Sequence, residues 1–234
     1  MIRNGQGPQE KPLLLVGNGR LACHFQFYFQ KLQIPFVTWQ RQSPISVIEA
    51  AANCSRVLLA ISDQALPEFV TTLQQSGSWP LVHFSGALNV DGCNSAHPLM
   101  SFGGELYPED FYRQIHFVVT GAQDLRELIP NLPNSFSILE AQDKARYHAL
   151  CVLGGNFPVL LWHKMETDLR KLGIPQDAIR SYIQRVCANY LTWGEKALTG
   201  PLVRGDVTTI EKNLEALKSD PWHDVYQSFR EAHP

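Results

Sequence analysis

The chain has 234 residues, of which 44% are hydrophobic and 18% are charged, and its formal net charge is −2 at pH 7. This composition predicts a globular chain of one large or two modest domains, without the basic surplus that would indicate a nucleic-acid partner. The five cysteines form no CxxC pair, so we expect neither a disulfide framework nor a zinc site. No segment approaches the roughly 18 uninterrupted apolar residues of a membrane span. With a polar start that lacks a signal-peptide core, the sequence predicts a cytoplasmic protein with no membrane partner.

The first predicted element is a strand, 13–16, which runs into a glycine-rich turn and then a helix-periodic apolar segment. In VGNGRLA, Gly17 permits a sharp exit from the strand, Gly19 lets backbone amides approach a pyrophosphate, and Ala22 lets the helix pack closely. The helix N-terminus adds unpaired donors and the positive end of its dipole. The alternative is a strand–helix connection without a ligand. The residues expected to bind a dinucleotide here are Gly17, Asn18, Gly19, Arg20, Leu21 and Ala22.

Strands and helices alternate over the next hundred residues. Further strands are expected at 35–39, 56–62, 80–86, 96–99, 115–121 and 135–139, with helices at 46–53, 64–75 and 122–130. This alternation is typical of a parallel sheet with helices on both faces. The sequence therefore predicts an α/β fold with an N-terminal Rossmann-type domain.

Beyond residue 140 the periodicity is entirely helical, with helices expected at 142–172, 176–197, 207–218 and 222–232. We therefore expect a flexible tail (1–11), an NAD(P)-binding Rossmann domain (12–140) and an all-helical domain (141–234). One helix carries an apolar stripe that must be buried, either within its domain or across a two-fold axis, which predicts a homodimer through the helical domain. The stripe consists of Tyr182, Val186, Tyr190 and Trp193.

The end of the second strand indicates which dinucleotide is bound. In sites of this type an Asp or Glu there holds the ribose hydroxyls of NAD, whereas an Arg accommodates the 2′-phosphate of NADP. The segment 38–43, TWQRQS, has no acid and contains Arg41, whose guanidinium fork suits a phosphate. We expect NADP to be preferred over NAD, the alternative being that Arg41 is a solvated surface residue. Ser62, after the third strand, is assigned to the same cofactor site.

Six segments occur in a recognisable order: VGNGRLA, ISDQAL, HFSGAL, AHPL, KARYHALCVLGGNF and LTGPLVRGD. Together they resemble the Rossmann-like oxidoreductases that carry a helical C-terminal domain of unknown function. These are distant relatives of pyrroline-5-carboxylate reductase, prephenate dehydrogenase and 6-phosphogluconate dehydrogenase. The resemblance extends from about residue 12 through nearly the whole chain. It implies an NAD(P)-binding domain followed by a helical domain in a protein that is often dimeric. It does not identify the substrate.

Two candidate catalytic residues follow strands of the predicted sheet. Ligands of such sheets bind at the carboxyl ends of the strands, where Ser85 and His97 are expected. In prephenate dehydrogenases, which this arrangement resembles, a Ser and the His of an HP dipeptide meet the substrate near the nicotinamide. A His of near-neutral pKa is suited to accept the proton released with hydride loss. The alternatives are that His97 is a structural residue before Pro98, and that Ser85 serves its turn and orients His97.

A second set of candidates shares one helix face. Lys144, His148, Cys151 and Gly155 are spaced i, i+4, i+7 and i+11. The first two carry protons, and the glycine end would let a nicotinamide or substrate approach, unless another helix packs there. In the wider superfamily a Lys and an Asn of the corresponding helix act on the substrate, but Asn156 is offset from this face by a third of a turn. The alternative to a catalytic role is that Lys144 is a solvated surface lysine.

The loop 198–206, LTGPLVRGD, is the third candidate region. Arg204 offers a fork for a carboxylate or phosphate, and Asp206 is placed to cap the following helix. The resemblance implies that this loop lines the substrate cleft, while a simpler interpretation pairs Arg204 with Asp206. The histidines lack HxxxH or HExxH spacing, so no catalytic metal is expected.

These patterns predict an NADP-dependent oxidoreductase that transfers a hydride between nicotinamide and a small polar substrate, either an alcohol/ketone or an amine/imine pair. His97 or the pair Lys144 and His148 would move the proton. The alternative is a non-catalytic protein that binds NADPH as a sensor or regulator, because fold does not fix function.

Overall fold

The computed structural model describes residues 11–232. The predicted flexible tail, 1–11, lies outside the described residues apart from Lys11. By its internal contacts the chain divides into two compact units, residues 1–158 and 159–234. The strands end at residue 138, and helix α6 (Lys144–Cys151) still belongs to the first unit.

The first unit is built on a seven-stranded sheet of order β2-β1-β3-β4-β5-β6-β7. Its strands are β1 (Leu13–Val16), β2 (Phe36–Trp39), β3 (Arg56–Leu59), β4 (Leu81–His83), β5 (Asn94–Pro98), β6 (Phe117–Thr120) and β7 (Phe136–Ile138). The α/β fold predicted from the sequence is confirmed. The sheet departs from an all-parallel one at a single pair, because β6 runs antiparallel to β5, with Ala96 opposite Val119. β7 then pairs parallel to β6, so the last two strands run against the other five.

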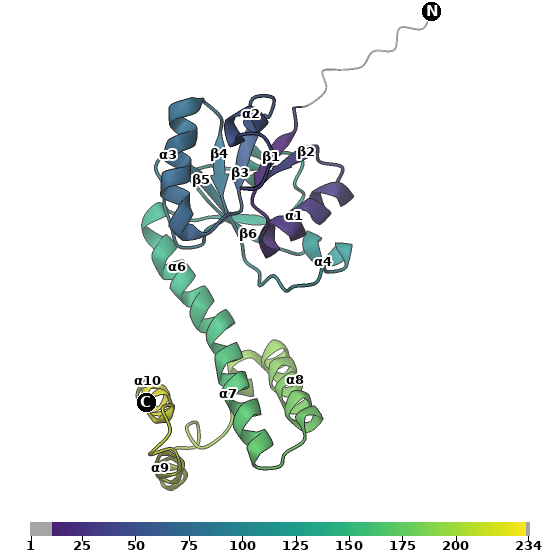
Figure 1. The fold of residues 1–234 in the computed structure, drawn as a ribbon. Helices are drawn as coiled ribbons and strands as arrows, with labels where there is room; N and C mark the ends of the chain where they lie inside the picture. The colour runs from purple at the N-terminus through teal and green to yellow at the C-terminus, as the bar shows by residue number, and fades with distance from the viewer. Residues whose placement is uncertain (1–10, 233–234) are drawn as a thin grey trace, which may run out of the picture. The chain divides into compact units, whose positions relative to one another are not determined.

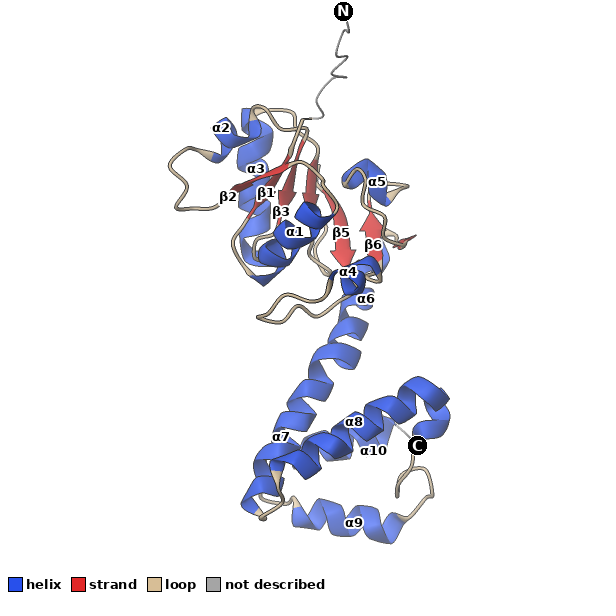
Figure 2. Ribbon diagram, turned by 90° about the vertical axis from the view of Figure 1, so that its right-hand side faces the viewer, coloured by secondary structure: helices blue, strands red, loops and turns tan. Residues whose placement is uncertain are grey.

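Helices cover both faces of this sheet (Figures 1 and 2). Successive side chains of a strand point to opposite faces. Leu13 and Leu15 therefore pack in one core with helix α1 (Arg20–Lys31), while Leu14 and Val16 pack in the other. The second core also contains residues of α2 (Val47–Ala51) and α3 (Leu66–Ser76). The remaining short helices are α4 (Glu109–Arg113), which was not predicted, and α5 (Leu125–Leu128), which is shorter than the predicted helix 122–130.

Helices alone follow β7 in the described part of the chain. They are α6, a π-helical turn (Val152–Asn156), α7 (Phe157–Lys171), α8 (Gln176–Trp193), α9 (Val207–Ala216) and α10 (His223–Ala232). The Asp206 carboxylate accepts the backbone N–H of Thr209 at 3.1 Å, which confirms its predicted role as the cap of α9. Within the second unit, Lys164 pairs with Asp168 at 2.6 Å and with Asp220. None of the helices between residues 11 and 232 is both long and apolar enough to cross a bilayer.

Candidate functional site

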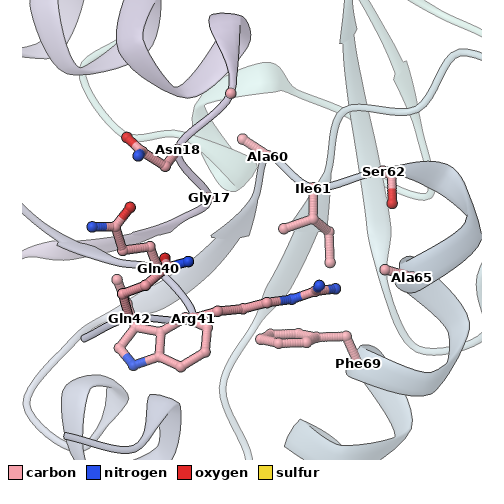
Figure 3. A pocket seen from close by; sticks show the side chains of 12 residues that line it. Gly17, Asn18, Gln40, Arg41, Gln42, Ala60, Ile61, Ser62, Ala65 and Phe69 are labelled. Carbon is pink, nitrogen blue, oxygen red and sulfur yellow. The ribbon is translucent and has the colours of Figure 1, made fainter. Parts of the chain in front are cut away.

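A cavity of about 370 Å³ opens beside the turn that follows β1; we call it the glycine-turn cavity. Its lining residues are Gly17, Asn18, Gly19, Trp39, Gln40, Arg41, Gln42, Ala60, Ile61, Ser62, Ala65 and Phe69. Figure 3 shows the Arg41 side chain extending across the cavity between Ile61 and Phe69. The predicted cofactor residues Gly17, Asn18, Gly19, Arg41 and Ser62 are thus brought together. The other three, Arg20, Leu21 and Ala22, begin helix α1 and do not line the cavity.

The two glycines of the turn have different physical roles. Gly17 has a φ of +127°, and a Cβ atom there would collide with the carbonyl oxygen of Ala60. Its lack of a side chain is therefore required by the close approach of the segment after β3. No described atom lies within 4 Å of the place where a Cβ of Gly19 would stand. The protein itself does not need a glycine at this position, so the open backbone is available to a ligand.

Helix α1 begins at this turn without an anionic partner of its own. The N-cap residue is Gly19, so no side chain caps the helix start, and the first helical turn contains no acidic residue. Ala22 is fully buried, which holds the helix start close to the sheet. The unpaired N–H groups of the first turn favour an anion, and the Arg41 guanidinium suits a second phosphate. The residues present therefore fit a phosphorylated dinucleotide.

A second cavity of about 450 Å³ is formed by the end of β5, the loop after it and the α6 region; we call it the histidine cavity. Its lining residues are His97, Leu99, Met100, Ser101, His148, Leu150, Cys151, Gly154, Gly155 and Asn156. The ring centroids of His97 and His148 are 6.1 Å apart. Three predicted catalytic residues, His97, His148 and Asn156, thus share one cavity.

His97 is held from one side by a residue that the sequence did not indicate. Its Nδ1 lies 2.7 Å from the hydroxyl oxygen of Tyr147. Burial lowers the pKa of His97 to about 4, and charge on His148 and Lys144 acts in the same direction against a smaller opposite effect of Asp63. The ring is therefore neutral at pH 7. Tyr147 lies 50 residues away along the chain, and no spacing pattern connects the two positions.

A π-helical turn, Val152–Asn156, follows α6 at the edge of this cavity. A π turn contains more residues than an α turn, so it shifts the residues after it around the helix axis. Asn156 is the last residue of this turn, and it lines the same cavity as His148. A Cβ added at Gly154 or Gly155 would meet no described atom within 4 Å. Helix packing within the described chain therefore does not account for this glycine pair.

Lys144 does not share the cavity with His148. Its side chain is only 1% exposed, and its Nζ donates to the carbonyl oxygen of Leu88 at 2.5 Å. Burial lowers the pKa of Lys144 to about 8. The interpretation as a solvated surface lysine is therefore wrong. The residues expected on one face of this helix therefore separate. Lys144, in the first turn of α6, contacts the loop after β4, whereas His148 and Cys151 line the cavity.

Ser85 serves its own turn. Its hydroxyl donates to the Asp63 carboxylate at 2.8 Å and accepts the backbone N–H groups of Ala87 and Leu88 at 3.2 and 3.0 Å. Among the hydrogen bonds of residues 11–232, none joins Ser85 to His97. This geometry corresponds to the alternative in which Ser85 stabilises its own turn, and no direct hydrogen bond orients His97.

The loop that carries Ser101 into the cavity wall is held by a hydrogen-bond network that is buried at His24 and Tyr112. The His24 ring contacts the Tyr112 hydroxyl at 2.7 Å through Nδ1 and the Gly103 carbonyl oxygen at 3.2 Å through Nε2. The Tyr107 hydroxyl accepts the Gly103 N–H at 2.5 Å and donates to the Ser101 carbonyl oxygen at 2.9 Å. We refer to these contacts as the loop network. Sequence reasoning gave His24 no role, since its partners lie far away along the chain.

In the second unit, the stripe on α8 is not buried within the chain. Its residues are 42–65% exposed: Tyr182, Val186, Tyr190 and Trp193.

Arg204 is exposed, and no ion pair joins it to Asp206 in the described structure. Between residues 11 and 232, no three His, Cys, Asp or Glu side chains are grouped so as to hold a metal ion.

Comparisons with known proteins agree with this architecture. The family model described as "Domain of unknown function (DUF2520)" matches residues 115–232, and no curated protein matches the sequence. A protein from Bacteroides fragilis described as an NADP oxidoreductase superposes with a TM-score of 0.76 at 18% identity, covering 95% of this chain and 97% of its own. A protein from Thermotoga maritima superposes with a TM-score of 0.67 at 21% identity, and the match covers 94% of this chain and 96% of that protein. A reductive aminase from Aspergillus terreus in complex with NADPH superposes with a TM-score of 0.61 at 12% identity, and the match covers 96% of this chain and 95% of the aminase. These similarities confirm the predicted Rossmann-like fold with a helical C-terminal region.

Proposed function

Because the chain belongs to the family of the domain of unknown function DUF2520, whose description names no reaction, we propose its function from the site itself. The protein is an NADP-dependent oxidoreductase that acts on a small polar substrate, either an alcohol/ketone or an amine/imine pair. One observation carries this proposal: the glycine-turn cavity joins an open Gly19 backbone, an uncapped helix start and the Arg41 guanidinium. NADPH in the structure of the similar reductive aminase supports it.

Each part of the cofactor has a matching group in the glycine-turn cavity. The backbone at Gly19 and the first turn of α1 would hold the pyrophosphate, and Arg41 would hold the 2′-phosphate. Ser62 lies on the wall of the same cavity and offers a hydroxyl to the ribose or phosphate oxygens. Bound NADPH supplies the hydride. Arg41 sets the preference for NADP over NAD, because the segment 38–43 has no carboxylate to hold a free 2′-hydroxyl.

The histidine cavity provides the groups for the substrate. His97 lines the cavity and is the residue that would give a proton to the substrate oxygen or nitrogen as the hydride is transferred, while the ring takes up a proton at its other nitrogen. Its pKa of about 4 differs from the near-neutral value expected from the sequence, because the ring is buried. His148, Ser101 and Asn156 line the same cavity and offer polar atoms that would orient a small substrate. Arg204, on the 198–206 loop, is assigned to the substrate cleft by the resemblance to oxidoreductases of this architecture.

The α8 stripe supports a homodimer formed through the helical region. Tyr190 and Trp193 are 65% and 58% exposed, which is a large apolar area for a helix surface in water. A second copy of the chain would bury it around a two-fold axis. Light scattering at micromolar concentration should give the mass of a dimer, and Tyr190→Glu should shift the mass toward that of a monomer. A wild-type monomer would contradict this part of the proposal.

Cofactor titration tests the central proposal. NADPH and NADH are added to the full chain at moderate ionic strength, and binding is followed by nicotinamide fluorescence. NADPH should bind more tightly than NADH, and equal affinities would contradict the assignment of Arg41. NADPH oxidation is then screened against 2-keto acids, imines and aldehydes. Tight binding without turnover across this panel would favour an NADPH sensor over an enzyme.

A further inference from the structure

Tyr147 contacts His97 through one of the two ring nitrogens, Nδ1. Its hydroxyl oxygen lies 2.7 Å from Nδ1, and the two ring planes are inclined at 80° with centroids 5.5 Å apart. On the other side of the ring, a Cβ added at Gly86 would lie 2.9 Å from Nε2. A side chain at residue 86 would therefore crowd Nε2, and the glycine avoids this. Among residues 11–232, the hydrogen bond of the His97 side chain is the one through Nδ1, and none is formed by Nε2.

The hydrogen bond between Tyr147 and His97 has a preferred direction. A phenol is a far stronger acid than the N–H of a neutral imidazole, and an imidazole nitrogen is a better acceptor than a phenol oxygen. The phenol is therefore the donor and Nδ1 the acceptor. A neutral imidazole has one N–H, so its hydrogen must then be on Nε2.

The surroundings keep both protons in place. Burial raises the pKa of Tyr147, and its contact with Cys151 acts in the same direction, so the phenol stays protonated. A cysteine sulfur is a weak acceptor, so Cys151 competes poorly with Nδ1 of His97 for the phenol hydrogen. Burial keeps the His97 ring neutral at pH 7. The other charged or titratable groups that act on His97 are His148, Lys144 and Asp63. Lys144 donates to a backbone carbonyl and Asp63 accepts from Ser85, so neither competes for Nδ1.

We propose that Tyr147 is a positioning residue that fixes His97 as the Nε2–H tautomer, so that the histidine cavity presents an N–H donor to its substrate. Such a donor is complementary to the lone pair of a carbonyl oxygen or an imine nitrogen, which defines the class of substrate. This inference rests on the proposed function and deepens it, because it specifies which form of the substrate the resting site binds. Tyr147 acts through His97 and need not touch the substrate.

The tautomer is measured directly on the wild-type chain, without substrate or cofactor. Long-range ¹H–¹⁵N correlation spectra of the histidine-labelled protein at pH 7 distinguish protonated from unprotonated ring nitrogens, and His97→Gln assigns the signals. We expect Nδ1 to be unprotonated and Nε2 to carry the hydrogen. Detection of hydrogen on Nδ1 would overturn the proposal.

Tyr147→Phe removes only the hydroxyl, and Tyr226→Phe is the matched control. Tyr226 also has one hydrogen-bonded hydroxyl, which accepts from Asn213 in the second unit at 3.0 Å. Tyr147→Phe should shift the Nδ1 signal of His97 and introduce the second tautomer, and Tyr226→Phe should leave both unchanged. With a reducible substrate from the screen, kcat should fall about 10- to 100-fold in Tyr147→Phe while the Kd for NADPH stays constant. Unchanged His97 signals in Tyr147→Phe would contradict the assignment.

The two proposals fail in different experiments. Absence of NADPH binding, with Nδ1 of His97 still unprotonated, would remove the proposed function and leave the role of Tyr147 intact. NADPH binding together with hydrogen on Nδ1 would do the reverse. If Tyr147→Phe does not fold, the wild-type spectrum alone decides the tautomer.

Discussion

The glycine-turn cavity and the histidine cavity lie in the same compact unit but are built in different ways. The first is formed by strand ends and a turn, and its single ionisable side chain, Arg41, is exposed. In the second, His97 is a histidine whose pKa burial has moved far below its ordinary value. Exposed backbone and a permanent cation are suited to holding a ligand, whereas pKa values shifted by burial are typical of chemistry. The proposed function accordingly assigns cofactor binding to the first cavity and the chemistry to the second.

Loss of the His97 imidazole should have the largest effect. His97→Ala should reduce turnover by about 10²- to 10⁴-fold, the range for a residue that transfers a proton. Its affinity for NADPH should stay at the wild-type value, because His97 does not line the glycine-turn cavity. Steady-state kinetics together with a cofactor titration separate the two effects. Full turnover in His97→Ala would move the proton carrier to His148, which lines the same cavity.

The two glycines of the turn should respond in opposite ways to the same substitution. Gly17→Ala places a Cβ against the Ala60 carbonyl at a φ of +127°, so the free energy of unfolding should fall by about 2–4 kcal/mol. Gly19→Ala meets no protein atom and should cost less than about 1 kcal/mol of stability, while NADPH binding weakens. Urea denaturation and NADPH titration of both variants test this pair. Equal destabilisation by the two substitutions would contradict the distinction.

Removal of the Arg41 guanidinium should affect binding alone. Losing a charge-assisted contact with the 2′-phosphate should weaken NADPH binding by about 1.5–3 kcal/mol. NADH has no such phosphate, so its affinity should hardly change, and turnover at saturating NADPH should remain close to wild type. Titrations with both cofactors provide the internal control. An equal loss for NADPH and NADH would show that Arg41 does not read the 2′-phosphate.

A smaller effect concerns the pH dependence of stability. Burial lowers the pKa of His97 to about 4 and that of His83 to about 3, whereas in the unfolded chain each is near 6.5. Between pH 6.5 and 4 the unfolded state therefore binds more protons, so the free energy of unfolding should fall as the pH falls. Each histidine contributes at most about 1.4 kcal/mol per pH unit. Denaturation curves at pH 7, 6 and 5 should be less pH-dependent in His97→Gln, and an unchanged slope would contradict burial as the cause.

The glycine-turn cavity could be predicted from the sequence because its parts are local. Gly17, Gly19 and Arg41 lie directly after the first two strands, and parallel pairing with β1 in the centre brings those strand ends together. The antiparallel placement of β6 could not be predicted, since its residues 117–120 are as apolar as those of a parallel strand.

The histidine cavity was only partly predictable. His97 and His148 were identified separately, but the partner that orients His97 depends on how α6 packs against the sheet. The π turn that ends at Asn156 could not be predicted, because the sequence pattern there does not differ from that of an α-helix. Lys144 was mistaken for a possible surface residue, since only packing determines that its ammonium group reaches a carbonyl oxygen.

If the histidine cavity binds the substrate, as proposed, the loop network also affects the thermodynamics of that binding. A free loop loses about 1–2 kcal/mol of backbone conformational entropy for every residue that becomes ordered around a ligand. His24, Tyr107 and Tyr112 already hold the backbone at Ser101 and Gly103 before any ligand arrives. The entropic cost of ordering this wall is thus met during folding. A small substrate with few contacts can then bind without offsetting that cost through its own interactions.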